Sequence, residues 1–230
     1  MFWQSALPAS EPIVVEVPVI VEVPVVVETP VVEVPTKPEP GTDTDSDGLT
    51  DVEEELYGTD YRNPDTDADS FLDGNEVFHR YDPLGYSPQT LLDTGRVSIF
   101  EPSDELFSVY YPKVWKTAIT SGGVIFNTND TAKIEISKQA KQTPCESLSV
   151  WYKREVAPNS MADDLQESMT KVGYLSLMSN NELRAYVDGE GGYVYVFTYD
   201  LVDEIKIEYL NTFQMMVNSL TVLDIKQQCD

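Results

Sequence analysis

The stretch "DTDSDGLTDVEE", from Asp43 to Glu54, decides how the N-terminal half of this chain folds. A similar stretch, "DTDADSFLDGNE", from Asp65 to Glu76, follows 22 residues later. Carboxylates at this density repel one another, so a folded form needs a cation to hold them together. The sequence therefore predicts two metal-binding loops.

The spacing of the acids in both stretches is that of a calcium loop, D-x-D-x-D-G-x5-E. Alternate positions place side chains on one inner side of a tight loop, position 7 supplies a backbone carbonyl, and position 12 closes the ligand sphere with a Glu. The ligands predicted in the first loop are therefore Asp43, Asp45, Asp47, Leu49 (carbonyl), Asp51 and Glu54. Those predicted in the second are Asp65, Asp67, Asp69, Phe71 (carbonyl), Asp73 and Glu76.

The two loops differ at position 6, where the bend requires a positive φ. Gly48 occupies this position in the first loop and Ser70 in the second. A left-handed residue other than glycine costs roughly 1–2 kcal/mol. The second loop is therefore predicted to bind its ion more weakly.

The repeat is not an EF-hand pair, because "TKPEPGT" before Asp43 cannot form the entering helix. The stretch "DTDSDGLTDVEEELYGTDYRNPDTDADSFLDGNEV" resembles the thrombospondin type 3 repeats of surface and secreted proteins, over about residues 41–85. The resemblance implies that calcium replaces a hydrophobic core, and that Asp60 and its repeat equivalent Asp82 join the ligands.

Composition excludes some partners. The chain holds 40 acidic and 15 basic residues, for a formal net charge of −25. Nucleic acid and anionic membranes are polyanions, so neither is an expected partner. No run of about 18 apolar residues exists that would span a membrane. "MFWQSALPAS" lacks the basic start and apolar core of a signal peptide, although it is compatible with the trailing edge of a removed signal or anchor.

Residues 1–40 are rich in Pro, Val and Glu, with a proline every five or six residues between Pro12 and Pro35. Proline fixes φ and removes a donor, so a helix is excluded and an extended stalk or linker is predicted. Two alternatives stay open. The valine-rich runs can add a strand to a partner's sheet edge, as in self-assembly, or they can pack on their own chain.

Residues 91–230 have the composition of a folded domain, and residues 41–88 form the repeat segment before it. Strands followed by helices, then more strands and a closing helix, predict an α+β domain around an antiparallel sheet. The expected strands are 96–100, 106–111, 122–127, 132–137, 174–178, 182–187, 193–200 and 204–210, and the expected helices are 144–156, 159–172 and 211–223, the last capped by Asn211.

Catalysis is not expected in this domain, because the single histidine, His79, lies in the repeat segment. Its absence beyond residue 87 removes the usual Ser-His-Asp, Cys-His and zinc chemistry. The odd positions of "YVYVFTY", from Tyr193 to Tyr199, share one face of a strand, either buried under a helix or open as a glycan platform. Cys145 and Cys229 are either a disulfide or two buried thiols.

Two stretches of this domain resemble PsbP-like domains. "ELFSVYYPKVWK", 105–116, is similar to their opening hairpin, and "YLNTFQMMVNSLTVL", 209–223, is similar to their closing helix. The resemblance covers about residues 95–223. It implies an α-β-α sandwich that serves binding or assembly, with no catalytic residues to transfer.

Together these observations predict a multi-domain, non-enzymatic, extracytoplasmic calcium-binding protein, bacterial and either secreted or held at the cell surface. An extended stalk leads into a calcium-rigidified connector, which presents a PsbP-like binding or assembly domain. A self-assembling subunit that uses the N-terminal arm is the first alternative. A calcium-dependent hydrolase, which needs an open acidic cleft, is the second.

Overall fold

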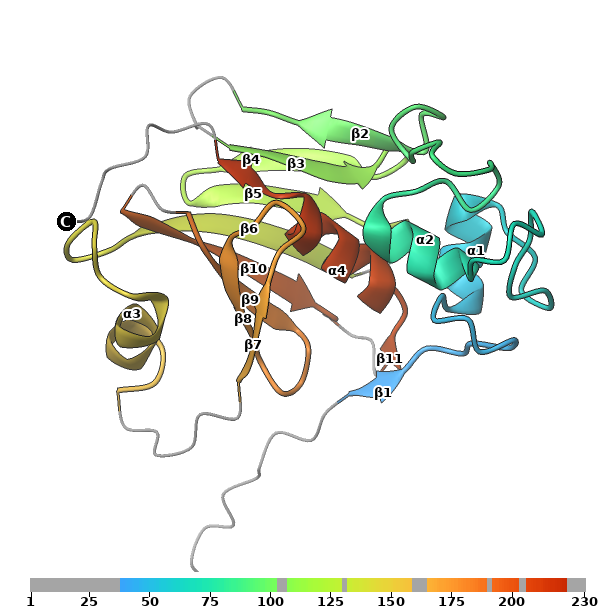
Figure 1. Cartoon of the computed structure of the whole chain (residues 1–230). Coiled ribbons are helices and arrows are strands. Elements are labelled where there is room, and N and C mark those ends of the chain that lie inside the picture. The colour runs from blue at the N-terminus through green and yellow to red at the C-terminus, as the bar shows by residue number, and fades with distance from the viewer. Residues whose placement is uncertain are drawn as a thin grey trace, which may run out of the picture. The chain divides into compact units, whose positions relative to one another are not determined.

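A computed structural model describes residues 38–102, 107–129, 132–158, 165–189, 192–202 and 206–222 (Figure 1). They belong to one compact unit with α+β architecture. The helices are α1 (Asp51–Tyr57), α2 (Asp73–His79), α3 (Leu148–Glu155) and α4 (Leu210–Ser219). The predicted α+β fold around an antiparallel sheet is confirmed.

The main sheet has seven antiparallel strands in the order β4-β5-β6-β10-β9-β8-β7. Their bounds are β4 Lys116–Thr120, β5 Gly123–Asn127, β6 Lys133–Ala140, β7 Gln166–Met169, β8 Leu175–Met178, β9 Arg184–Asp188 and β10 Tyr193–Asp200. A second sheet has the order β12-β3-β2, from β2 Val97–Phe100, β3 Phe107–Pro112 and β12 Thr221–Val222.

The central strand β10 is buried on both faces. Tyr195, Phe197 and Tyr199 face the larger core, where Phe197 and Tyr199 pack on Phe213 of α4 with ring centroids 6.4 and 6.0 Å apart. Val194 and Val196 face a smaller core with Trp151 of α3. The interpretation of the aromatic face as buried under a helix is therefore confirmed for Phe197 and Tyr199, whereas Tyr195 is buried against Phe107 of the second sheet, and none of the three rings is available as a platform.

Two helix predictions are wrong. Residues 166–169, expected within a helix over 159–172, form β7, because they pair with β8 along the edge of the sheet and this pairing outweighs local helix propensity. Residues 159–164 of that expected helix lie outside the described part. Asn211 does not cap α4, since the capping position is Tyr209 and the helix already begins at Leu210.

The acidic repeat contributes to the core of the α+β fold. Leu49, Tyr57 and Val77 are at most 1% exposed and belong to the same hydrophobic cluster as the residues of α4 and β10. Helix α2 packs beside α4, as Figure 1 shows. Residues 41–88 and 91–230, separate segments of the sequence, thus share a core in the described structure.

The N-terminal segment enters the description only at residue 38, so the stalk and strand-addition predictions fall on residues 1–37, outside the described part. Strand β1 (Glu39–Pro40) pairs in parallel with β11 (Lys206–Ile207). Cys145 is exposed and disulfide-bonded, whereas Cys229 lies outside the described residues. Among the described helices, none has the length and apolar character needed to cross a membrane.

Candidate metal centre

The two acidic loops have the same backbone conformation. Position 4 is left-handed in both, with φ of 66° at Ser46 and 63° at Ala68, and so is position 6, with φ of 103° at Gly48 and 81° at Ser70. The predicted positive φ at Ser70 is therefore present. Two loops 22 residues apart in sequence fold to one template, as their spacing indicates.

Each loop gathers the carboxylates of its first three acids. One oxygen from each of Asp43, Asp45 and Asp47 lies within 4.8 Å of the other two, and the same holds for Asp65, Asp67 and Asp69. Two oxygens bound to one calcium ion, each about 2.3–2.6 Å from it, are at most about 5 Å apart. The spacing in both loops is compatible with a shared ion.

Backbone amides hold the first acid of each loop in place. Asp43 accepts hydrogen bonds from the N–H groups of Ser46 and Gly48, at 2.7 and 3.1 Å. Asp65 accepts them from Asp69 and Ser70, at 3.1 and 2.9 Å. These bonds fix the backbone turn around the first acid of each loop.

The acids at positions 3 and 12 are different, because they turn oxygens without partners into the loops. Neither oxygen of Asp45, nor of Glu76, has a hydrogen-bond partner among the described residues, and one oxygen each of Glu54 and Asp67 also lacks one. Glu54 is 1% exposed and Glu76 is 3% exposed. Buried carboxylate oxygens are almost always satisfied, so these are oxygens without their natural partner.

The electrostatics of the two glutamates indicate that they lie near the loop acids. Burial raises the pKa of Glu54 to about 8, assisted by the charges of Asp45 and Asp47. Burial likewise raises the pKa of Glu76 to about 8, assisted by Asp69 and Asp67. A cation at the centre of each loop would offset both the burial and the repulsion.

The position 9 acids brace the loops. Asp51 accepts from the backbone N–H and the hydroxyl of Thr44, at 3.0 and 2.9 Å. Asp73 accepts the equivalent pair from Thr66, at 2.9 and 2.6 Å. Direct ligation by Asp51 and Asp73 stays a prediction, as does ligation by the carbonyls of Leu49 and Phe71.

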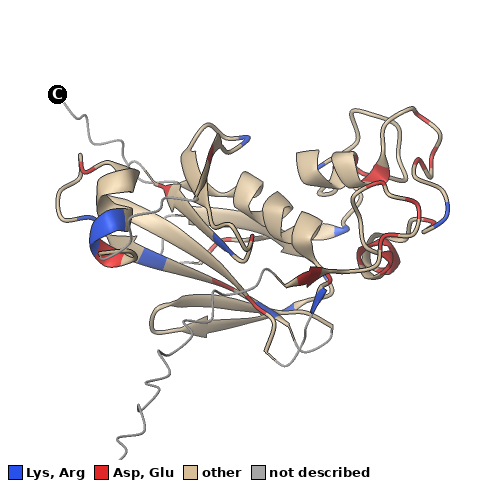
Figure 2. Cartoon of the chain, turned by 90° about the horizontal axis from the view of Figure 1, so that it is seen from below, with Lys and Arg blue, Asp and Glu red and all other residues tan. Residues whose placement is uncertain are grey.

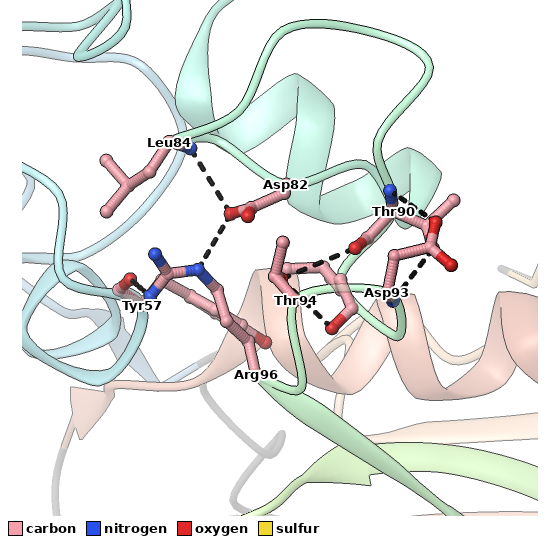
Figure 3. A network of polar contacts seen from close by, with 8 residues as sticks. Tyr57, Asp82, Leu84, Thr90, Asp93, Thr94 and Arg96 are labelled. Carbon is pink, nitrogen blue, oxygen red and sulfur yellow. Dashed lines mark hydrogen bonds and ion pairs between the residues drawn. The ribbon is translucent and has the colours of Figure 1, made fainter.

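The repeat equivalents Asp60 and Asp82 are in different surroundings. Asp60 is exposed and accepts from the N–H of Arg62 at 3.2 Å. Asp82 is 2% exposed, and its Oδ1 accepts from Arg96 Nε at 2.7 Å and from the N–H of Leu84 at 3.2 Å (Figure 3). The pKa of Asp67 is raised mainly by burial and to a smaller extent by neighbouring charges, among them Asp82. Asp82 therefore lies near the second loop. The ligand role inferred for this pair is untested.

Arg96 ties the second repeat to the first. Besides its ion pair with Asp82, its guanidinium donates to the backbone carbonyl of Tyr57, at the end of α1 (Figure 3). Asp and Glu residues, red in Figure 2, are concentrated on α1 and the loops beside it. The ion pair of the half-buried Arg96 with the buried Asp82 therefore lies at the edge of a strongly acidic region.

The loops dock on the start of α4 through residues that the sequence did not single out. Glu53, fully buried, accepts from the N–H of Thr212 at 2.6 Å and from the N–H of Thr50 at 3.2 Å. The Thr50 hydroxyl donates to the carbonyl of Glu208 at 2.6 Å, and the hydroxyls of Tyr57 and Thr212 are 3.2 Å apart. Only the capping-box pattern Thr50-x-x-Glu53 was readable from the sequence.

Comparison with known proteins gives a similarity of fold. No protein-family model and no curated protein matches the chain. Among solved structures, the chain is similar to the solution structure of cyanobacterial PsbP (CyanoP) from Synechocystis sp. PCC 6803, with 13% sequence identity and a TM-score of 0.37. The match covers 61% of this chain and 99% of that one. No function is transferred to this chain from that similarity.

Proposed function

We propose that residues 41–88 bind two calcium ions, one in each acidic loop. The observation that carries the proposal is the set of buried oxygens without partners at positions 3 and 12, from Asp45, Glu54, Asp67 and Glu76. Asp45 and Asp67 belong to the two carboxylate clusters, and the charges of these clusters act on Glu54 and Glu76, so each proposed centre would be built only from oxygen. Sites of this kind suit hard cations, and a flexible loop with many carboxylates favours calcium over magnesium.

Binding would stabilise the α+β fold. The loops dock on α4, so the free energy of calcium binding to the folded form is added to the free energy of unfolding. Extracellular calcium modules bind at roughly 10⁻⁴–10⁻³ M. Binding in this range would suit an extracytoplasmic location, where calcium would keep the loops ordered on a non-enzymatic binding or assembly domain, with residues 1–40 as the stalk.

The test is calcium titration calorimetry on chelator-stripped full-length protein. We expect two sites, the site of loop 1 lost in Asp45→Asn and that of loop 2 lost in Asp67→Asn, each removing a carboxylate charge with little change in shape. Glu135→Gln, an exposed acid on β6, is the matched control and should keep both sites. Absence of heat at millimolar calcium in the wild type would refute the proposal.

The two alternatives remain predictions. Strand addition by the valine-rich arm concerns residues outside the described part. A hydrolase would need an acidic cleft on the α+β domain; a cavity of about 240 Å³ between α4 and β7–β8 includes Glu167 and Glu182 in its lining. His79, the only histidine of the chain, is on α2 of the repeat segment.

A further inference from the structure

The side chain of Asn211, in the first turn of α4, lies between the two acidic loops. Its amide Nδ2 donates to the carbonyl of Gly48 at 3.2 Å and to the carbonyl of Gly74 at 2.9 Å. Gly48 is position 6 of the first loop and Gly74 is position 10 of the second. One side chain from the α+β domain thus uses both of its amide hydrogens to hold one backbone group of each loop.

The loops also touch each other at Gly74. Its N–H donates to Oδ2 of Asp47, a carboxylate of the first loop's cluster, at 3.2 Å. A Cβ at this position would lie 2.5 Å from the Asp47 carbonyl oxygen and 2.9 Å from the Gly48 carbonyl carbon. Because the backbones meet without room for a methyl group, a shift of one loop must move the other.

The chemistry at position 211 requires a hydrogen-bond donor and disfavours an acid. Both partners are carbonyl oxygens, which only accept hydrogen bonds, so an apolar residue at position 211 would leave them without this donor. The surrounding loops are dense in carboxylates, so an acid at position 211 would add repulsion. The amide satisfies the partners without adding charge. It fixes the distance between the bend of the first loop and the helix start of the second.

We propose that Asn211 is a positioning residue that couples the two calcium loops, so that occupation of one strengthens binding at the other. The inference rests on the proposed function, because it concerns the affinities of the same two loops. When the first loop closes on an ion, Asp47 and Gly48 are fixed, and through Gly74 and Asn211 they fix the backbone that carries Glu76. The second loop then loses less conformational entropy when it binds its own ion, so its affinity for calcium is higher.

The experiment measures how the affinity of loop 2 depends on loop 1, by calcium titration calorimetry of the full chain. In the otherwise wild-type protein, Asp45→Asn should weaken calcium binding at loop 2 by about five-fold or more, the lower end of usual coupling between sites. In an Asn211→Leu background, the same substitution should change it less than about two-fold. A merely structural role would lower affinity or stability without removing this dependence.

Two matched variants sharpen the test. Gln214→Leu makes the same chemical change one turn further along α4, at a side chain without a described hydrogen bond to either loop, and should keep the coupling. Gly74→Ala should abolish it through the contact with Asp47, whereas Gly122→Ala, with open space around its Cβ, should not. Near-ultraviolet circular dichroism shows whether each variant is folded.

The outcomes separate the two claims. Two calcium sites in the wild type with the same loop-2 response to Asp45→Asn in both backgrounds would overturn the coupling and leave the proposed function standing. Full coupling retained in Gly74→Ala would overturn it in the same way. No calcium binding by the wild type would remove both. Coupling lost in Asn211→Leu and Gly74→Ala, but kept in their controls, is the expected result.

Discussion

At the scale of single residues, the two loops show one template filled in two ways. Position 6 is Gly48 in the first loop and Ser70 in the second, yet both are left-handed. Position 7 is Leu49, buried in the main core, in the first loop and Phe71, 52% exposed, in the second. The second loop thus carries backbone strain at one more position than the first, and it lacks the apolar anchor of the first.

Replacing Ser70 by glycine should relieve that strain. We expect Ser70→Gly to raise the free energy of unfolding of the metal-free protein by about 1 kcal/mol, since the strained φ of 81° is present in the folded form without an ion. Denaturant unfolding followed by tryptophan fluorescence measures it. Ser98→Gly, in strand β2, is the control and should lower stability, because glycine weakens a strand. A lower free energy of unfolding in both variants would contradict the assignment of backbone strain to Ser70.

The residue scale also marks the limit of sequence reasoning at the candidate centre. Loop spacing identified the acids that carry the oxygens without partners, because that spacing is a local property of the chain. Asn211 and Gly74 could not be found in this way. Their role depends on contacts 137 and 27 residues apart in sequence, and no local pattern encodes such a contact.

At the scale of elements, α1 and α4 are joined by one carboxylate. Glu53 completes the capping box of α1 and also accepts from the N–H of Thr212, in the first turn of α4. Negative charge at a helix start is favourable because it meets free N–H groups and the positive end of the helix dipole. The acidic repeat therefore helps to begin a helix that is 159 residues away from Glu53.

Removal of this carboxylate should be costly. We expect Glu53→Ala to lower the free energy of unfolding by about 2–4 kcal/mol, from the loss of two charge-assisted bonds in a buried position. Urea unfolding of calcium-saturated protein checks this value. Glu55→Ala, at an exposed residue on the same helix, controls for helix propensity and should have little effect. Equal losses in the two variants would mean that Glu53 acts only through α1.

Elements with strong local patterns were predicted well. The alternation in 193–200 corresponds to β10, and the apolar spacing in 211–223 corresponds to α4, which ends at Ser219; Thr221–Val222, expected in the same helix, form β12 because they pair with β3. Strand β7 was predicted as a helix, because its residues Gln166–Met169 have no alternation and are held as a strand by β8 alone. Strand β4, exposed along its whole length, was not predicted, since an unburied edge strand leaves no hydrophobic signal.

At the scale of the whole molecule, the repeat and the α+β domain behave as one structure. The sequence placed a boundary between residues 88 and 91, where composition changes. In the structure, Leu49, Tyr57 and Val77 fill a core shared with α4 and β10. Composition reveals a change of local character, but it does not reveal that an acidic segment supplies a few apolar side chains to its neighbour.

A chain that begins at Leu91 is therefore expected to lose stable folding. It would lack three buried apolar side chains and the Glu53 carboxylate at the start of α4. The free energy lost with these four groups together exceeds the usual free energy of unfolding of a domain. Thermal unfolding followed by near-ultraviolet circular dichroism would show no cooperative transition. A chain beginning at Pro38 is the control and should unfold as the full chain does. Cooperative unfolding of the shorter chain at wild-type temperature would establish independent domains.

The stability of the protein should depend on pH more strongly without calcium than with it. In the metal-free fold, burial and neighbouring acids raise the pKa of Glu54 and Glu76 to about 8 and burial raises that of Glu53 to about 7. The folded state then holds protons that the unfolded chain releases near pH 4.3, so metal-free stability falls as pH rises from about 5 to 8. Calcium would replace the protons of Glu54 and Glu76, the two glutamates assigned to the loops, so the gain from calcium should grow over the same range.

Melting temperatures measured from pH 5 to 8 in chelator and in saturating calcium test this relation. The chelated protein should melt at lower temperature as pH rises, and the difference between the two curves should widen. A difference that stays constant across this range would contradict the assignment of the buried glutamates to the ion. Glu54→Gln, which cannot release a proton, should flatten part of the slope in chelator.

The pairing of β1 with β11 also sets the path of mechanical force through the molecule. A pull on the N-terminal side arrives at Glu39 and Pro40, crosses to Lys206 and Ile207, and is passed at once to the start of α4, where the first loop is docked. If residues 41–57 were torn from this anchorage, they would lengthen the tether by about 55–60 Å at full extension. With calcium in the first loop, residues 41–57 would stay folded under load, and calcium depletion would let this segment extend.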